Sequence, residues 1–229
     1  MTAGNENDAR RQFCFFDLDG TLADTDPDIR RAWKAALSDL GLDCPHFDEK
    51  FVAGPPIDEM TRILFPAIFT ASLADAVRRS FAAHYDNDGF PLTREYPGVL
   101  DEVRRLKAEG RTLAIVTNKR FAAATAMARH FGWNEVFDGV YAGDMLADPA
   151  VAARFGTTAG KVRKPELLRA VMAEFGATPA DCALVGDTSS DFEAAAANGV
   201  LSVGVAWGYG TPDELSRADI LCRALPFPL

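Results

Sequence analysis

The chain has 229 residues, of which 48% are hydrophobic, so it can bury a sizeable core as one domain or as one domain that carries an insertion. Its 33 acidic and 24 basic residues give a formal net charge of −9, which argues against a general nucleic-acid or anionic-membrane surface. The sequence contains no stretch close to the ~20 continuous apolar residues of a membrane span, and its polar segment 1–12 lacks the apolar centre of a signal peptide. We therefore expect a soluble, cytoplasmic protein in which any phosphate binding is local.

The first predicted element is an apolar strand at 13–16 that leads into Asp17-Leu18-Asp19-Gly20-Thr21. Because side chains alternate along a strand, Asp17 and Asp19 leave its end on the same side, and Gly20 lets the chain bend and expose backbone N–H groups. An ordinary Asp-Gly turn would explain one of these acids but not both. Two carboxylates beside N–H donors suit a metal ion and a phosphate group.

A mainly helical segment follows this turn. Apolar residues recur at helical spacing in three stretches, which are separated by Gly and Pro signals such as Gly54-Pro55-Pro56. The predicted helices are 28–40, 57–65 and 73–85. We interpret residues 24–91 as a helical insertion, a cap domain, in a core formed by 1–23 and 92–229.

From about residue 96, helices alternate with short apolar strands. The predicted helices are 100–108, 122–131, 165–175 and 192–197, and the predicted strands are 112–116, 136–142, 182–185 and 201–205. This alternation is typical of βαβ units, so the sequence predicts an α/β fold with a parallel sheet. Ligands bind such sheets at the carboxyl ends of the strands, where the polar segments 17–21, 117–119 and 186–191 would converge.

The acidic residues of these segments support phosphoryl transfer. We expect Asp17 to be the nucleophile, since a carboxylate can accept a phosphoryl group. Asp17 and Asp187 offer hard oxygen ligands for Mg²⁺, with the backbone carbonyl of Asp19 as a third. The Asp19 side chain would protonate the leaving oxygen and then activate water.

Polar groups at the other strand ends would bind the phosphate. Thr117 offers a hydroxyl, although threonine at a helix start is also an ordinary N-cap. The N–H groups around Leu18, Gly20 and Asn118 can bind the equatorial phosphate oxygens.

Lys164, which opens a predicted helix, would supply a fixed positive charge to the phosphate. Lys161 is the alternative for this role, because the sequence does not determine which lysine of this segment lies beside the phosphate. Asp191 would orient Lys164 or a metal-bound water, or would simply interact with a helix dipole.

These residues resemble the four motifs of the haloacid dehalogenase-like (HAD) hydrolase superfamily. The matching segments, in order along the chain, are Asp17-Leu18-Asp19-Gly20-Thr21, Thr117-Asn118, Lys164-Pro165 and Gly186-Asp187-Thr188-Ser189-Ser190-Asp191. The resemblance implies a Rossmann-like core, Mg²⁺ and an aspartyl-phosphate mechanism. The helical insertion and the tail Gly204-Val205-Ala206-Trp207-Gly208-Tyr209-Gly210 resemble the phosphoglycolate phosphatase-like group. The presence of Asp19 favours a phosphatase over a true dehalogenase, which lacks the second aspartate.

The sequence thus predicts a Mg²⁺-dependent phosphatase that acts on a small phosphorylated metabolite, with phosphoglycolate as the first candidate. A sugar-phosphate phosphomutase, a 5'-nucleotidase and a pyrophosphatase are alternatives on the same scaffold. A non-catalytic binding module is a further alternative, which the retention of every proposed catalytic group disfavours. The expected partner is a small molecule, with no nucleic acid and no membrane.

Overall fold

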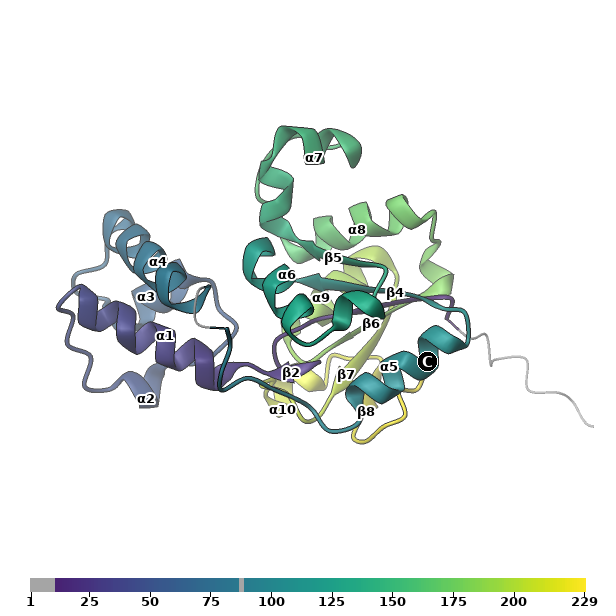
Figure 1. Ribbon diagram of the computed structural model, residues 1–229, viewed down its shortest axis with the longest axis horizontal. Helices are drawn as coiled ribbons and strands as arrows, with labels where there is room; N and C mark the ends of the chain where they lie inside the picture. The colour runs from purple at the N-terminus through teal and green to yellow at the C-terminus, as the bar shows by residue number, and fades with distance from the viewer. Residues whose placement is uncertain (1–10, 87–88) are drawn as a thin grey trace, which may run out of the picture. The chain divides into compact units, whose positions relative to one another are not determined.

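The computed structural model describes residues 11–86 and 89–229, which fall into two compact units (Figure 1). One unit comprises Met1–Leu22 and Glu95–Leu229, and the other comprises Ala23–Arg94. Among the described residues, no helix is both long and apolar enough to cross a membrane.

The larger unit is built on a six-stranded sheet in the order β5-β4-β1-β6-β7-β8. Its strands are β1 (Phe13–Phe16), β4 (Thr112–Thr117), β5 (Gly139–Ala142), β6 (Cys182–Gly186), β7 (Leu201–Val205) and β8 (Ile220–Cys222). All neighbouring pairs are parallel, and Phe13 of β1 is in register with both Thr112 of β4 and Cys182 of β6. The predicted α/β fold with a parallel sheet is therefore confirmed.

The helices of this unit include the four that the sequence predicts after residue 96 and two that it does not predict. They are α5 (Val99–Ala108), α6 (Phe121–His130), α7 (Pro149–Arg154), α8 (Lys164–Phe175), α9 (Ser189–Asn198) and α10 (Pro212–Leu215), with short 3₁₀ helices η1 (Trp133–Glu135), η2 (Gly143–Ala147) and η3 (Pro179–Asp181). Helix α8 is capped at its C-terminal end by Gly176, whose φ of 63° is the left-handed conformation that glycine adopts readily. A capping box formed by Thr188 and Asp191 begins α9.

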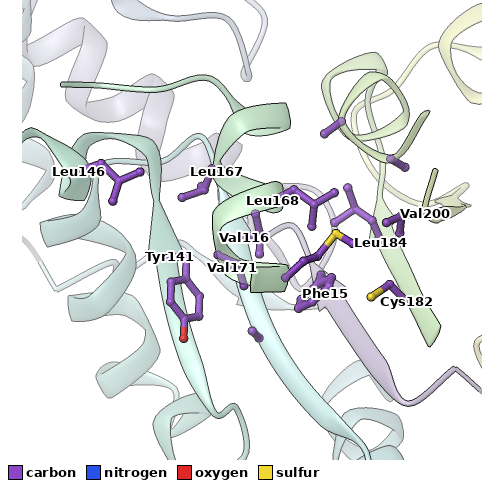
Figure 2. Close-up of a cluster of buried hydrophobic side chains, with 14 residues drawn as sticks. Phe15, Val116, Tyr141, Leu146, Leu167, Leu168, Val171, Cys182, Leu184 and Val200 are labelled. Atoms are coloured by element: carbon purple, nitrogen blue, oxygen red, sulfur yellow. The ribbon is translucent and has the colours of Figure 1, made fainter. Parts of the chain in front are cut away.

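One face of the sheet packs against α8 and α9. Figure 2 shows Leu167, Leu168 and Val171 of α8 beside Phe15 and Val116 of the strands, and these five side chains are fully buried. Burying a large apolar side chain contributes about 1.5–3 kcal/mol, so this cluster fixes α8 on the sheet. It thereby also fixes Lys164, the first residue of α8.

The opposite face carries Phe16, whose ring centroid lies 5.7 Å from that of Phe137 and 5.5 Å from that of Phe227. The expectation of a strand over 136–142 was wrong in its first half. Gly132, with a φ of 71°, leads into η1, and β5 begins only at Gly139. Val136 and Phe137 are apolar because they are buried in this turn, not because they pair in the sheet.

Between β5 and α8 the chain makes an excursion over residues 143–163, which contains η2 and α7 (Figure 1). Its buried side chains Leu146 and Ala152 are each 1% exposed. The N–H of Val162 donates to the carbonyl of Gly143 at 3.1 Å, so the two ends of the excursion are joined. The excursion therefore returns to the sheet edge before α8 begins at Lys164.

The smaller unit contains the helices α1 (Asp26–Asp39), α2 (Phe47–Lys50), α3 (Ile57–Leu64) and α4 (Ala71–Tyr85). Trp33 of α1 packs its ring against Phe51 at 5.6 Å and against Phe81 of α4 at 5.9 Å. Two short strands, β2 (Ala23–Asp24) and β3 (Arg94–Glu95), pair where the chain passes between the units. The role of this helical unit as a cap stays a prediction.

Candidate active site

The three polar segments meet because β4, β1 and β6 are adjacent in the sheet. Asp17 directly follows β1, and its N–H continues the sheet pairing by donating to the carbonyl of Val185 at 2.8 Å. Thr117 is the last residue of β4, and Asp187 directly follows β6. The carboxyl ends of three parallel strands therefore bring these side chains to one edge.

Three buried carboxylates form a cluster at this edge. Oxygen atoms of Asp17, Asp187 and Asp191 lie within 4.8 Å of one another. Asp17 is 8% exposed, and the other two are fully buried. The cluster therefore brings together residues of the first predicted motif, 17–21, and of the last, 186–191.

Lys164 provides the neighbouring positive charge. Its Nζ lies 2.8 Å from Oδ1 of Asp17 and also donates a hydrogen bond to Oδ1 of Asp191. The pKa of Lys164 is raised: burial opposes the rise, but the carboxylates of Asp17 and Asp191 outweigh it. Lys161 is exposed, whereas Lys164 is 2% exposed, so the geometry favours Lys164 among the two candidates.

Both carboxylate oxygens of Asp187 are held by hydrogen bonds. The hydroxyl of Thr21 donates to Oδ1 at 3.1 Å, and the backbone N–H of Tyr209 donates to Oδ2 at 2.7 Å. Burial, together with the nearby carboxylates of Asp191 and Asp17, raises the pKa of Asp187 to about 8. The two hydrogen bonds favour the charged form but do not offset these effects.

The charge balance of the cluster fits a divalent cation. Three carboxylates face one ammonium, and burial also raises the pKa of Asp17, with Lys164 opposing and Asp191 adding to the rise. Carboxylate oxygens are the ligands that hard cations such as Mg²⁺ prefer. A bound dication would offset the excess negative charge that burial makes unfavourable.

Asp19 has a separate partner. Its Oδ1 accepts a hydrogen bond from Nζ of Lys119 at 2.8 Å, and the backbone N–H of Lys119 donates to the hydroxyl of Thr117 at 3.1 Å. The sequence assigned no role to Lys119, although it lies in the predicted Thr117-Asn118-Lys119 segment. Its proximity to two predicted catalytic residues was the signal that could have identified it.

The predicted phosphate-binding groups lie around the same turn. The carbonyl of Leu18 accepts the N–H groups of Thr21 and Leu22, and Gly20 has a φ of 77°, so residues 18–22 form a tight turn. The side chain of Leu18 is fully buried, which leaves its backbone as the part that can bind a ligand. Asn118 donates to Oγ of Ser190 at 2.7 Å and thereby connects the second and fourth motifs.

The family model described as haloacid dehalogenase-like hydrolase matches residues 12–199. The chain belongs to this family. Its match includes all four motifs and therefore all the predicted site residues. The resemblance inferred from the motifs is confirmed.

Curated relatives of this family are similar over most of the chain. A probable phosphatase IndB of Dickeya dadantii is 32% identical, over 89% of this chain and 85% of that protein. A 5'-nucleotidase of Pseudomonas aeruginosa is 31% identical, over 87% and 85%. A phosphoglycolate phosphatase of Neisseria meningitidis is 31% identical, over 92% and 89%. The prediction of a phosphatase is thereby confirmed.

The fold is also shared with solved structures. A predicted phosphatase from Clostridium acetobutylicum superposes with a TM-score of 0.77 at 23% identity, covering 93% of each chain. This likeness supports the Rossmann-like core at the level of the fold.

Proposed function

We propose that the protein is a Mg²⁺-dependent hydrolase of a small phosphomonoester that works through a phosphorylated aspartate. The observation that carries the proposal is the buried arrangement of Asp17, Lys164 and Asp187 at the carboxyl end of the central strand. A nucleophilic carboxylate, a fixed cation and a set of metal ligands are the components that phosphoryl transfer requires.

Asp17 performs the first step by attacking the phosphorus, so that an O–P bond forms to its carboxylate and the bond to the leaving oxygen breaks. Lys164 holds the attacked carboxylate in place through its contact at 2.8 Å, and its charge offsets that of the phosphate. Asp17 and Asp187, with the backbone carbonyl of Asp19, would hold Mg²⁺. When bound, the cation neutralises charge on the phosphate and keeps Asp17 ionised.

Asp19 acts as general acid in the first half-reaction and as general base in the second. It gives a proton to the leaving oxygen, which departs as an alcohol, and it then takes a proton from the water that attacks the phosphoaspartate. Inorganic phosphate leaves, and both carboxyl groups return to their starting state. The side chain of Asp19 does not belong to the cluster of Asp17, Asp187 and Asp191, so it is available for proton transfer while the backbone carbonyl of Asp19 would bind the cation.

The remaining groups bind the phosphate and support the lysine. The phosphate oxygens would accept hydrogen bonds from the hydroxyl of Thr117 and from the N–H groups of Leu18, Gly20 and Asn118. Asp191 holds Lys164 by a hydrogen bond from the ammonium. This bond fixes the position of the lysine with respect to Asp17.

The compact unit Ala23–Arg94 would serve as the helical cap that selects the leaving group. Phosphoglycolate is the first candidate substrate, supported by the Neisseria relative. A nucleoside monophosphate is the second candidate, because the relative from Pseudomonas aeruginosa is named a 5'-nucleotidase.

The proposal is tested by measuring phosphate release from a panel of small phosphomonoesters, with Mg²⁺ and with EDTA. We expect release with Mg²⁺, loss with EDTA, and a decrease of at least about a thousandfold in Asp17→Asn. Asp101→Asn, at a side chain that is 85% exposed, is the matched control. Rearranged sugar phosphate without phosphate release would show a phosphomutase, and turnover by Asp17→Asn would contradict the assigned nucleophile.

A further inference from the structure

A loop from the C-terminal part of the chain contacts the proposed metal ligand Asp187. This loop, residues 207–210, follows β7 and precedes α10, and it lies beyond the residues that the family model matches. Its Tyr209 N–H donates to Oδ2 of Asp187 at 2.7 Å. A backbone donor, rather than a side chain, therefore fixes one oxygen of the carboxylate.

Glycines allow this close approach. A Cβ on Gly208 would overlap the side chain of Asp187, and a Cβ on Gly210 would overlap its backbone carbonyl. On the other side, a Cβ on Gly20 would overlap the carboxylate and would contact the ring of Tyr209 at 2.9 Å. Asp187 is thus enclosed by backbone at three positions where any larger residue would push it away.

The loop is held at both ends. Nε1 of Trp207 donates to the carbonyl of Thr21 at 3.2 Å, and the N–H of Ala206 donates to the carbonyl of Cys222 at 2.9 Å. On the far side, Glu214 of α10 accepts a hydrogen bond from Oγ of Ser189 at 3.0 Å. The chain on either side of the loop is thus bonded to β8 and α9, and Trp207 is bonded to the turn that follows Asp19. The loop therefore holds Asp187 in a fixed position.

The hydroxyl of Thr21 holds the other carboxylate oxygen, Oδ1, at 3.1 Å. Nε1 of Trp207 donates to the backbone carbonyl of Thr21, so the loop and the threonine that hold the two oxygens of Asp187 are themselves joined by a hydrogen bond. Each carboxylate oxygen can accept more than one bond, which leaves lone pairs for a cation. The carboxylate is therefore oriented before any cation arrives.

We propose that the 207–210 loop is a positioning element for Asp187 that sets the affinity of the site for divalent cations. The inference rests on the proposed function in treating Asp187 as a metal ligand. Hydrogen bonds that orient a ligand typically change metal affinity by ~10–100-fold when they are lost. Trp207, Gly208 and Gly210 act through Asp187 and do not touch the reacting atoms.

The test is a calorimetric titration of Mg²⁺ and of Mn²⁺ into the full-length protein, with thermal unfolding recorded in EDTA. Gly208→Ala is expected to raise both dissociation constants by ~10-fold or more. The matched control is Gly160→Ala, because a Cβ at Gly160 meets nothing within 4 Å. The control is expected to bind both cations as the unchanged protein does.

Trp207→Phe provides the test should Gly208→Ala fail to fold. Phenylalanine keeps an aromatic ring next to Tyr96 and Phe227 but removes the hydrogen bond to Thr21 and part of the ring packing, so a several-fold rise in the dissociation constants is expected. The unfolding temperature in EDTA shows whether the variant is still folded. Unchanged cation affinity in a folded variant of either kind would overturn the proposal.

The same measurements separate this inference from the proposed function. Weakened cation binding in the loop variants would support the positioning role even if the unchanged protein released no phosphate. Conversely, phosphate release by a protein whose loop variants bind cations normally would overturn the positioning role alone.

Discussion

Lys119 Nζ lies 2.8 Å from Asp19 Oδ1 and donates a hydrogen bond to it, while the lysine side chain is only 6% exposed. The backbone N–H of Lys119 donates to the hydroxyl of Thr117. One residue thus fixes the proposed proton carrier with respect to a proposed phosphate-binding group.

Replacing Lys119 by Met is expected to lower kcat by roughly tenfold, because a hydrogen bond to a charged group is worth about 1.5–3 kcal/mol and Asp19 would lose its orientation. The effect should be larger for an alkyl phosphate, whose leaving oxygen needs a proton, than for p-nitrophenyl phosphate. Steady-state kinetics on both substrates measures the difference. Lys107→Met, at a side chain that is 38% exposed, should leave both rates unchanged, and an equal loss on both substrates would argue against an action through the protonation of the leaving oxygen by Asp19.

Replacing Lys164 by Met is expected to destabilise the protein as well as inactivate it. The substitution leaves the buried carboxylates of Asp17 and Asp191 without their ammonium, and breaking a buried ion pair costs about 3–5 kcal/mol. The unfolding temperature should fall by roughly 6–20 °C. Lys161→Met, in an exposed side chain, is the control, and equal effects of the two substitutions on stability and turnover would reverse the assignment of the lysine.

The stability of the cation-free protein is expected to fall as the pH rises. The pKa of Asp187 is raised to about 8, above the ~3.9 of an unfolded chain, so the folded state binds more protons between these values. The stabilising contribution is fully present below about pH 4 and is lost as the pH approaches about 8. Thermal unfolding in EDTA from pH 5 to pH 8 measures this dependence.

Asp187→Asn removes the titrating group and should flatten that pH profile, whereas Asp101→Asn should leave it unchanged. Cation binding must displace the same proton, so the affinity for Mg²⁺ should increase with pH below about 8. An unfolding temperature in EDTA that rises steadily from pH 5 to pH 8 would contradict the raised pKa.

Replacing Ser190 by Ala is expected to raise KM for the phosphate ester several-fold with a smaller effect on kcat. Oγ of Ser190 accepts a hydrogen bond from Nδ2 of Asn118 at 2.7 Å, and its loss would release the segment whose N–H is proposed to bind phosphate. Inhibition by inorganic phosphate should weaken in parallel. Ser216→Ala, which removes the hydrogen bond that Oγ donates to the carbonyl of Asp213 at 2.7 Å, should change neither quantity.

The convergence of Asp17, Thr117 and Asp187 could be predicted because it depends on two simple regularities. Apolar runs identify the strands, and the carboxyl ends of parallel strands meet at one edge. The structure places these residues on the adjacent strands β1, β4 and β6 or directly after them. Their catalytic roles stay predictions, which the variants above test.

Other features could not be predicted because side-chain patterns do not encode them. The contact between Tyr209 and Asp187 uses a backbone N–H, which every residue except proline carries. The pair of Lys119 and Asp19 spans 100 positions of the sequence. Val136 and Phe137 have the same apolar pattern in a buried turn as in a strand, so the pattern alone does not show that β5 begins only at Gly139.

The central place of β1 in the sheet has a consequence for the order of folding. Both of its neighbours, β4 and β6, are made much later in synthesis, since Phe13 pairs with Thr112 on one side and with Cys182 on the other. Strand β1 therefore leaves the ribosome with unpaired backbone N–H and C=O groups along both edges, and the second edge is paired only when β6 has been made. A nascent chain that ends before residue 182 would carry the Asp17 strand with one edge open, and an open strand edge can pair with another chain.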